Sequence, residues 1–327
     1  MRVLLTGGSG FVGGHILDLL RTRGVATVLF LRPASARRFE ELKLPLMDVR
    51  AGSLDEPERL REAMHGVTHV IHCAGAVKAL RDADFYEANQ LGTRHLVTAV
   101  NQAGDQVSRM VQISSLAAAG PATAETPSVE ESTAHPVSEY GKSKLAGEEE
   151  VKGGCRCEYV ILRPPSVYGP RDTEFLRLFK AVQAHIRPEF GFGRQQLSMV
   201  FAPDLAEAAF ACLTHSAAAG RTYNVAAPEV VTAGALAARI AQRMGVWAIR
   251  VPLPTVAFWS ACAIQQGVSS LTRKANVLSL QKYPELSAPG WVCDPTRLRK
   301  EMGFVCRTSL TEGIDATLAS YRELGWL

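Results

Sequence analysis

The sequence predicts an α/β fold of the Rossmann type, a doubly wound parallel sheet with a smaller C-terminal lobe. Three observations support this class. Short apolar runs alternate with helical patterns through the first half of the chain, which is typical of a parallel sheet covered by helices on both faces. A glycine-rich turn joins the first apolar run to the first helix. The chain has 327 residues, of which 47% are hydrophobic and 21% charged, which is enough for a large core.

Composition and charge argue against several classes of protein. The 36 basic and 32 acidic residues give a net charge of only +4 without a basic run, so no nucleic-acid partner is predicted. Seven irregularly spaced cysteines indicate reduced thiols and therefore a cytoplasmic protein. The first apolar stretch leads directly into glycines, which indicates a strand and not a signal peptide. The longest apolar run, residues 255–264, is well short of the ~20 residues of a membrane span, so no transmembrane segment is expected.

The first element pair is a strand at 3–5 and a helix from His15 to Leu20, with a glycine-rich turn between them. Gly7 permits the tight turn, Gly10 lets a pyrophosphate approach the backbone, and Gly13 lets helix and strand pack closely. Three glycines can also form a simple turn. The strand before them and the helix after them favour a dinucleotide cradle.

The residue after the second strand bears on which dinucleotide fits. This strand spans 26–31 and is followed by Arg32, with Arg37 and Arg38 close behind. An acidic residue at the strand end would bind the ribose hydroxyls of NAD, whereas arginines favour a 2′-phosphate. The sequence therefore predicts NADP(H) as the preferred cofactor and NAD(H) as the alternative, although arginines of this kind can also belong to a solvated loop.

The elements that follow continue the alternation of strands and helices. They are a strand at 46–50, a helix at 57–64, a strand at 68–74, a helix at 82–101 that contains Asn89, and a strand at 110–113. The last strand ends in Ser114-Ser115, at the carboxyl edge where parallel sheets bind ligands. A serine there can donate a hydrogen bond to a carbonyl or accept one from an alcohol.

Tyr140 and Lys144 lie four residues apart in a predicted helix, so they share one face. Pro136 and Ser138 precede this helix, and Gly153-Gly154 ends it. A nearby lysine charge lowers the pKa of a tyrosine from its usual ~10 toward the working pH, which makes the pair an acid–base device. The alternative is a half-buried tyrosine beside a solvated lysine.

Taken together, these motifs resemble the extended short-chain dehydrogenases/reductases, the superfamily of NAD(P)-dependent epimerases and dehydratases. The resemblance rests on stretches in that family's order, namely 6–13, 72–75, 89–93, 114–115, 140–144, 163–170, 200–206, 223–226, 291–294 and 321–326. It implies that Tyr140 is the general acid/base, that Lys144 lowers the Tyr140 pKa and holds the nicotinamide ribose, and that Ser115 polarises the reacting oxygen. Ser114 is a neighbour that could share this role. No metal is required.

The resemblance also implies a set of cofactor-binding residues around the carboxyl edge of the sheet. They are Gly7, Ser9, Gly10, Phe11, Val12, Gly13, Arg32, Arg37, Ser53, Leu54, Ala74, Gly75, Asn89, Ile113, Tyr140, Lys144, Pro164, Ser166 and Val167. Ser53 stands where the family commonly has an aspartate at the adenine, so its hydrogen bond to the base is expected to be weaker.

Departures from the family pattern indicate the subclass. Sugar-nucleotide members usually carry an asparagine where this chain has Ser166, a tyrosine where it has Ala119, and a diphosphate-binding arginine where it has Leu197. The chain is thus closest to the 3β-hydroxysteroid dehydrogenase-like and ketone-reductase branch, which implies hydride transfer between the nicotinamide and a hydrophobic ketone or secondary alcohol, steroid-like or acyl-type. The alternative is a nucleotide-sugar epimerase or dehydratase with tightly bound NAD, in which Arg194 and Arg171 compensate for the missing arginine. A third hypothesis is a cofactor-sensing protein without turnover.

The expected organisation is an NAD(P)-binding domain at 1–169, to which later segments return, and a mainly substrate-binding lobe at 170–327. Four aromatic residues are candidate walls of the substrate site, namely Phe175, Phe190, Phe192 and Trp259. The apolar segment 252–286 is a candidate lid, or equally part of the core or of a subunit contact. By resemblance, the Tyr140 helix is expected to contribute to a homodimer.

Overall fold

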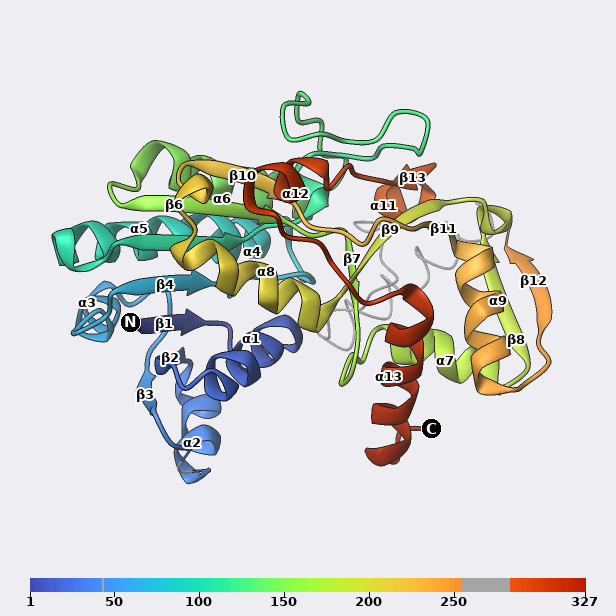
Figure 1. Ribbon diagram of the computed structural model, residues 1–327, viewed down its shortest axis with the longest axis horizontal. Helices are drawn as coiled ribbons and strands as arrows, with labels where there is room; N and C mark the ends of the chain where they lie inside the picture. Colours follow the sequence, from blue (N-terminus) through green and yellow to red (C-terminus); the bar gives the residue numbers. More distant parts are fainter. Residues whose placement is uncertain (43, 254–282) are drawn as a thin grey trace.

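The computed structural model describes residues 1–42, 44–253 and 283–327. Figure 1 shows a large sheet lobe that contains the N-terminus, beside a smaller lobe built from later parts of the chain. The predicted apolar segment 255–264, most of the candidate lid and Trp259 fall outside the described residues.

The larger lobe is built on a seven-stranded sheet in the order β3-β2-β1-β4-β5-β6-β10, in which every strand pair is parallel. The strands are β1 (Arg2–Thr6), β2 (Ala26–Leu31), β3 (Met47–Ala51), β4 (His69–His72), β5 (Arg109–Ile113), β6 (Glu158–Arg163) and β10 (Arg221–Asn224). The strand order reverses between β1 and β4, and such a switch point opens a ligand crevice at the carboxyl edge. The predicted Rossmann-type fold is confirmed.

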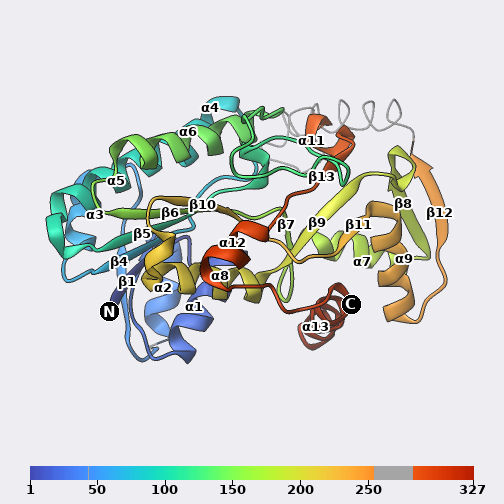
Figure 2. The ribbon, with the colours of Figure 1, turned by 45° about the horizontal axis from the view of Figure 1, so that its top comes forward.

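Helices cover both faces of this sheet, as Figure 2 shows with the sheet seen nearly edge-on. One face packs on α1 (Phe11–Thr22), α2 (Pro33–Glu41), α8 (Ala202–Thr214) and α12 (Thr296–Met302). The other packs on α3 (Pro57–Ala63), α5 (Gly92–Ala103) and α6 (Glu139–Gly154). Val3 and Leu5 point into the first of these cores and Leu4 into the second, which is the two-residue alternation of a strand buried on both faces.

The predicted helix at 82–101 is divided into three parts. It consists of α4 (Asp82–Tyr86), a π-helical turn η1 (Glu87–Leu91) and α5. The π-helical turn carries Asn89, and such turns often mark functional sites.

The smaller lobe is organised around β9 (Gln196–Phe201). This strand pairs with β7 (Ser166–Tyr168) and β13 (Gly290–Trp291) in parallel and with β11 (Val230–Thr232) antiparallel. A separate parallel pair joins β8 (Ile186–Phe190) to β12 (Ile249–Leu253). Within the described residues, the helices of this lobe are α7 (Phe175–Gln183), α9 (Ala233–Met244), α11 (Tyr283–Ser287) and α13 (Leu310–Glu323).

Segments far apart in the sequence meet in both lobes. β10 and α8 come from the second half of the chain and complete the larger lobe. The short 3-10 turn η3 (Leu116–Ala118) follows β5 and packs against the start of α6. None of the helices in the described ranges combines the length and the apolarity needed to cross a membrane.

Candidate active site

The glycine-rich turn between β1 and α1 has no room for a side chain at Gly7 or Gly13. Gly7 has φ +73°, and a Cβ there would lie 2.6 Å from the Ala74 nitrogen. A Cβ on Gly13 would lie 2.1 Å from the Gly7 oxygen. Gly10 precedes α1 without a side-chain cap, so a bound anion can accept hydrogen bonds from the first-turn N–H groups. This cradle fits the pyrophosphate of a dinucleotide.

The predicted cofactor residues further along the carboxyl edge of the sheet differ in exposure and in their contacts. Arg32 directly precedes α2 at the carboxyl end of β2, and both Arg32 and Arg37 are exposed. The Ser53 hydroxyl hydrogen-bonds Asp55 and thereby lowers the pKa of that carboxyl. Leu54 packs against Gly92 in the core below α5.

A buried histidine links the glycine-rich turn to α5. His72 lies at the end of β4, with its Nδ1 2.8 Å from Thr6 Oγ1 and its Nε2 3.0 Å from Thr93 Oγ1. Thr93 donates to the Asn89 carbonyl at 2.7 Å, so its hydroxyl accepts from His72 Nε2–H. Burial, together with the charge of Lys144, lowers the pKa of His72 to about 3, so the imidazole is neutral and serves as a structural link.

Asn89 fastens the segment after β4 to the helix that carries Tyr140. Its Oδ1 accepts from the Ala76 nitrogen at 2.8 Å, and its Nδ2 donates to the Ala76 carbonyl at 2.9 Å and to Ser143 Oγ at 2.9 Å. A Cβ on Gly75 would lie 2.6 Å from Asn89 Oδ1. The sequence suggested that Asn89 could merely satisfy backbone groups, and it does so at the point where three elements meet.

Ser115 and Tyr140 lie together in an inner cavity of about 320 Å³. Its walls are Val77, Ser115, Leu116, Ala117, Tyr140, Pro165, Ser166, Gln195, Leu197, Glu285, Leu286 and Trp291. Ser115 and Tyr140 are hydrogen-bonded through their side chains, and Ser115 Oγ also accepts from the Ala117 nitrogen at 3.1 Å. Lys144 is buried behind them, where its Nζ donates to the Ile113 carbonyl at 2.8 Å.

The pKa of Tyr140 moves in the opposite direction to the sequence-based expectation. Burial raises it to about 12, the charge of Glu285 adds to the increase, and the hydrogen bond with Ser115 opposes it. The pKa of Lys144 is lowered, chiefly by burial. Desolvation of the phenol therefore outweighs any help from the lysine charge, and Tyr140 is a protonated phenol able to donate a proton.

Ser114 does not share the role of Ser115. Its hydroxyl points away from the inner cavity and donates to Glu148 Oε1 at 2.6 Å. Glu148 is fully buried on α6 and forms a bidentate ion pair with Arg163 on β6, at 2.9 and 2.7 Å. Burial opposes ionisation, but Arg163 holds the pKa of Glu148 below its usual value. Ser114 thus belongs to the contact that joins α6 to the sheet.

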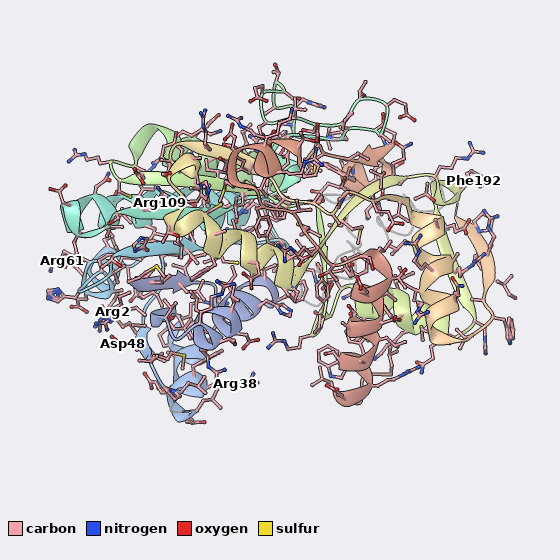
Figure 3. All side chains as sticks on the ribbon, in the orientation of Figure 1. Arg2, Arg38, Asp48, Arg61, Arg109 and Phe192 are labelled. Carbon is pink, nitrogen blue, oxygen red and sulfur yellow. The ribbon has the colours of Figure 1, made fainter. Side chains whose placement is uncertain are left out.

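An outer cavity of about 460 Å³ adjoins the inner one and shares Gln195 and Leu286 with it. Its other walls are Thr123, Glu125, Phe192, Arg194, Gln196, Ser287, Ala288 and Pro289. Of the four aromatic residues expected as walls, Phe192 is in place; Figure 3 labels it in the smaller lobe, far from Arg38 on α2. Phe175 packs instead against Tyr168, with ring centroids 6.1 Å apart. The Phe190 side chain and Trp259 lie outside what is described.

The two arginines considered as diphosphate ligands differ in position. Arg194 lines the outer cavity, where its guanidinium lies 6.0 Å from the centre of the Phe192 ring. Arg171 lines neither cavity; its guanidinium is ion-paired with Asp18 on α1 at 2.6 Å. Leu197, which the sequence comparison with the family expected at the position of the diphosphate-binding arginine, forms part of the wall of the inner cavity.

Sequence reasoning missed Glu285, which lines the inner cavity and hydrogen-bonds Ser138 just before α6. It lies in α11, in a Tyr-Pro-Glu-Leu stretch that matches no motif. Its place beside Tyr140 depends on a contact between residues 147 positions apart, for which no local pattern gives a signal.

Comparison with known proteins gives consistent results. The sequence model of the NAD dependent epimerase/dehydratase family matches residues 3–226 of this chain. A ceramide reductase of Caulobacter vibrioides is 30% identical over 99% of this chain and 96% of its own. A 4-hydroxy-2-methyl-3-oxo-4-farnesyl-3,4-dihydroquinoline-1-oxide ketoreductase of Stigmatella aurantiaca is 25% identical over 97% and 95%. Among solved structures, MoeE5 in complex with UDP-glucose and NAD has a TM-score of 0.78 at 22% identity, with 99% of each chain covered.

Proposed function

Because the chain belongs to the NAD dependent epimerase/dehydratase family, the extended short-chain dehydrogenases/reductases, we propose that it is a reductase of hydrophobic ketones that uses NADP(H). Membership makes it an NAD(P)-dependent enzyme. The proposal adds the substrate class, the direction of reaction and the preferred cofactor. Two of the relatives described above are named as reductases, which supports this choice.

The observation that carries the proposal is the composition of the cavity walls. By the resemblance to the family, Leu197 stands where sugar-nucleotide members carry the diphosphate-binding arginine. Glu285 is the single charged residue among the described walls of the inner cavity. The described walls of the outer cavity include one residue of each charge, Arg194 and Glu125. A nucleotide diphosphate would meet carboxylates where it needs an arginine fork. An uncharged ketone among mainly apolar side chains meets no such penalty.

The chemistry requires one proton and one hydride. The bound nicotinamide would supply the hydride to the carbonyl carbon. The Tyr140 hydroxyl donates its proton to the carbonyl oxygen as negative charge develops there, and the product is a secondary alcohol. Ser115 lies beside Tyr140 and donates a hydrogen bond to the same oxygen. Lys144 lies on α6, where its Nζ is fixed by the Ile113 carbonyl at the end of β5, and it would hold the nicotinamide ribose.

The preference for NADP(H) is supported by Arg32 and Arg37, which are exposed at the carboxyl end of β2 and on α2. The cofactor would occupy residues 1–169, and the mainly C-terminal lobe, residues 170–327, would hold the substrate. A homodimer that uses α6 and a cytoplasmic location belong to the same proposal.

The first test is the Tyr140→Phe variant, assayed by NADPH oxidation with a panel of hydrophobic ketones. Removing the proton donor is expected to lower kcat by about 100-fold or more. The NADPH Kd should stay within about threefold, because the ring is retained. Tyr159→Phe is the matched control, since Tyr159 packs in the core on β6, away from the cavity. Tyr140→Phe activity within a few-fold of wild type would rule out this role.

The alternative is a nucleotide-sugar epimerase or dehydratase that uses the same residues and retains NAD. Arg194 in the outer cavity is the feature that favours it. The reductase and the epimerase/dehydratase proposals can be distinguished by one experiment. Freshly purified protein is denatured, and any nicotinamide cofactor that it releases is identified. Near-stoichiometric NAD would support the alternative, whereas little cofactor, or freely exchanging NADP(H), would support the reductase.

A further inference from the structure

The two-stranded sheet of β8 and β12 presents an apolar surface to solvent. In its register Ile186 lies beside Ile249 and Pro188 beside Val251, so these four side chains share one face. Trp247 stands two residues before Ile249 and therefore continues the same alternation. Trp247 is 66% exposed and Ile249 is 62% exposed. We call these five residues the β8–β12 face.

The opposite face of this sheet packs toward α9. Glu189 on β8 is buried there beside Gly193 and Gly234, and Arg250 on β12 is ion-paired with it at 2.8 Å. Figures 1 and 2 both show β8 and β12 at the outer edge of the smaller lobe, with α9 on their inner side. The exposed apolar side chains thus gather on one outward surface, and patches of this kind mark interaction sites.

Trp247 is held in its exposed position by His185, which directly precedes β8. The two rings are stacked, with centroids 4.0 Å apart and planes 12° apart. His185 Nδ1–H donates to the Trp247 carbonyl at 2.7 Å, and the Ile249 nitrogen donates to the His185 carbonyl at 2.8 Å. An aromatic side chain that is already fixed loses little conformational entropy on binding.

The elements around the β8–β12 face carry unbalanced positive charge. Residues 175–194, which include α7 and β8, contain four basic residues and one acidic residue. Residues 233–253, which include α9 and β12, contain three basic residues and no acidic one. Three of these seven basic residues are ion-paired, with Glu189, Glu229 and Asp315. The other four have no ion pair with any described residue; they are Arg177, Lys180, Arg187 and Arg194.

The β8–β12 face leads toward the outer cavity. The turn η4 (Gly191–Gly193) follows β8 and packs against β12. It carries Phe192, which is 54% exposed, lines the outer cavity and lies on the outer side of the smaller lobe in Figure 3. The apolar surface that begins at Trp247 therefore ends at a wall of this cavity.

A bilayer surface with anionic lipids fits this combination better than a second copy of the chain. In a two-fold contact between copies, the same unpaired cations would meet one another. Anionic headgroups neutralise such cations, while exposed tryptophan and isoleucine side chains enter the boundary between headgroups and acyl chains.

We propose that the β8–β12 face is a membrane-docking surface that binds bilayers containing anionic phospholipid, with Trp247 and Ile249 inserted among the lipids. The inference goes beyond the proposed function and does not depend on it, because neither residue is assigned to catalysis or cofactor binding. Docking in this way would place Phe192 and the outer cavity close to the bilayer.

The test is co-sedimentation of the purified protein with vesicles of phosphatidylcholine alone or of phosphatidylcholine with about one third phosphatidylglycerol. Wild type should bind the anionic vesicles about tenfold or more tightly than the neutral ones, and added salt should weaken this binding. The double variant Trp247→Ser, Ile249→Ser should bind the anionic vesicles about tenfold or more weakly, because the inserted apolar area is lost. Leu42→Ser is the control, since Leu42 is 55% exposed just after α2 in the larger lobe, and it should bind as wild type does.

Charge reversal tests the electrostatic part of the inference. Arg177→Glu with Lys180→Glu on α7 should weaken binding to the anionic vesicles by about tenfold. Arg37→Glu with Arg38→Glu on α2 changes the net charge equally and should stay within about twofold of wild type. All four side chains are exposed, so both double variants are expected to fold.

Three results would overturn the inference. The first is wild type that stays in solution with both kinds of vesicle, and the second is a Trp247→Ser, Ile249→Ser variant that binds as tightly as wild type. The third is a dimeric wild type without vesicle binding that this variant converts to a monomer, because the β8–β12 face would then be a subunit contact. Failure to reduce any ketone would refute the proposed function and leave these binding results unaffected.

Discussion

Tyr140 keeps its proton because its surroundings penalise the phenolate. The ring is partly buried, its neighbours in the inner cavity are mostly apolar, and Glu285 adds a negative charge. Lys144 donates to the Ile113 carbonyl, and its own pKa is lowered by burial. These surroundings favour ketone reduction, the direction of reaction in which Tyr140 would act as an acid.

The raised pKa of Tyr140 leads to an expectation for the pH dependence of turnover. A general acid works while it is protonated, and the pKa of Tyr140 is raised to about 12. We therefore expect kcat/KM for ketone reduction to stay level between about pH 6 and about pH 9, and alcohol oxidation to rise with pH across that range. Steady-state rates in both directions measure this. A loss of reduction with a midpoint near neutral pH would mean that Lys144 lowers the Tyr140 pKa in the working enzyme after all.

The proposed preference for NADPH can be tested at single residues. Arg32→Ala should raise the KM for NADPH about tenfold or more and leave the KM for NADH nearly unchanged, because only NADPH carries the 2′-phosphate. Arg322→Ala is the comparison variant, since Arg322 is exposed in the last turn of α13, in the smaller lobe. Equal changes for the two cofactors would show that Arg32 does not contact the 2′-phosphate.

At the scale of elements, α6 places Tyr140 because glycines let it approach its neighbours. A Cβ on Gly147 would lie 2.3 Å from the Asn89 carbonyl oxygen, and one on Gly141 would lie 2.4 Å from the Ala117 oxygen. The first contact brings the helix against the π-helical turn η1, and the second brings it against η3. Both contacts are with backbone, which cannot move aside as a flexible side chain would.

A pair of glycine variants tests this packing. Gly147→Ala should lower the free energy of unfolding by about 1–3 kcal/mol through overpacking, and should reduce kcat as Tyr140 shifts. Gly153→Ala in the last turn of the same helix meets nothing within 4 Å, so it should be neutral or stabilise by up to about 1 kcal/mol. Urea unfolding of both variants measures the difference. Equal stability of the two variants would contradict the packing argument.

The sequence predicted the larger lobe better than the smaller one, for a physical reason. Strand, turn and helix at residues 2–22 are encoded by adjacent residues, and so is the Tyr140 helix with its Ser138 cap. The smaller lobe depends on pairing between distant segments, such as Trp291 beside Leu197. Periodicity gives no signal for such register. The same limit explains why Ser115 and Tyr140 were predicted and Glu285 was not.

On the scale of the whole molecule, the larger lobe carries the proposed redox site, and the smaller lobe supplies part of the cavity beside it. The cradle, Ser115, Tyr140 and Lys144 lie at the carboxyl edge of the sheet, whereas Leu197, Glu285 and Trp291 come from the smaller lobe. Under the proposed function, the larger lobe would carry out the chemistry, and residues of the smaller lobe would contribute to substrate choice.

The most direct test of the central proposal is to incubate the protein with a hydrophobic ketone and NADPH deuterated at the transferring position of nicotinamide C4, and to analyse the product by mass spectrometry. The account predicts a secondary alcohol with one deuterium on the carbinol carbon, together with released NADP⁺. The contradicting result is the absence of labelled alcohol with every ketone of the panel, from a protein that retains NAD and inverts a UDP-sugar.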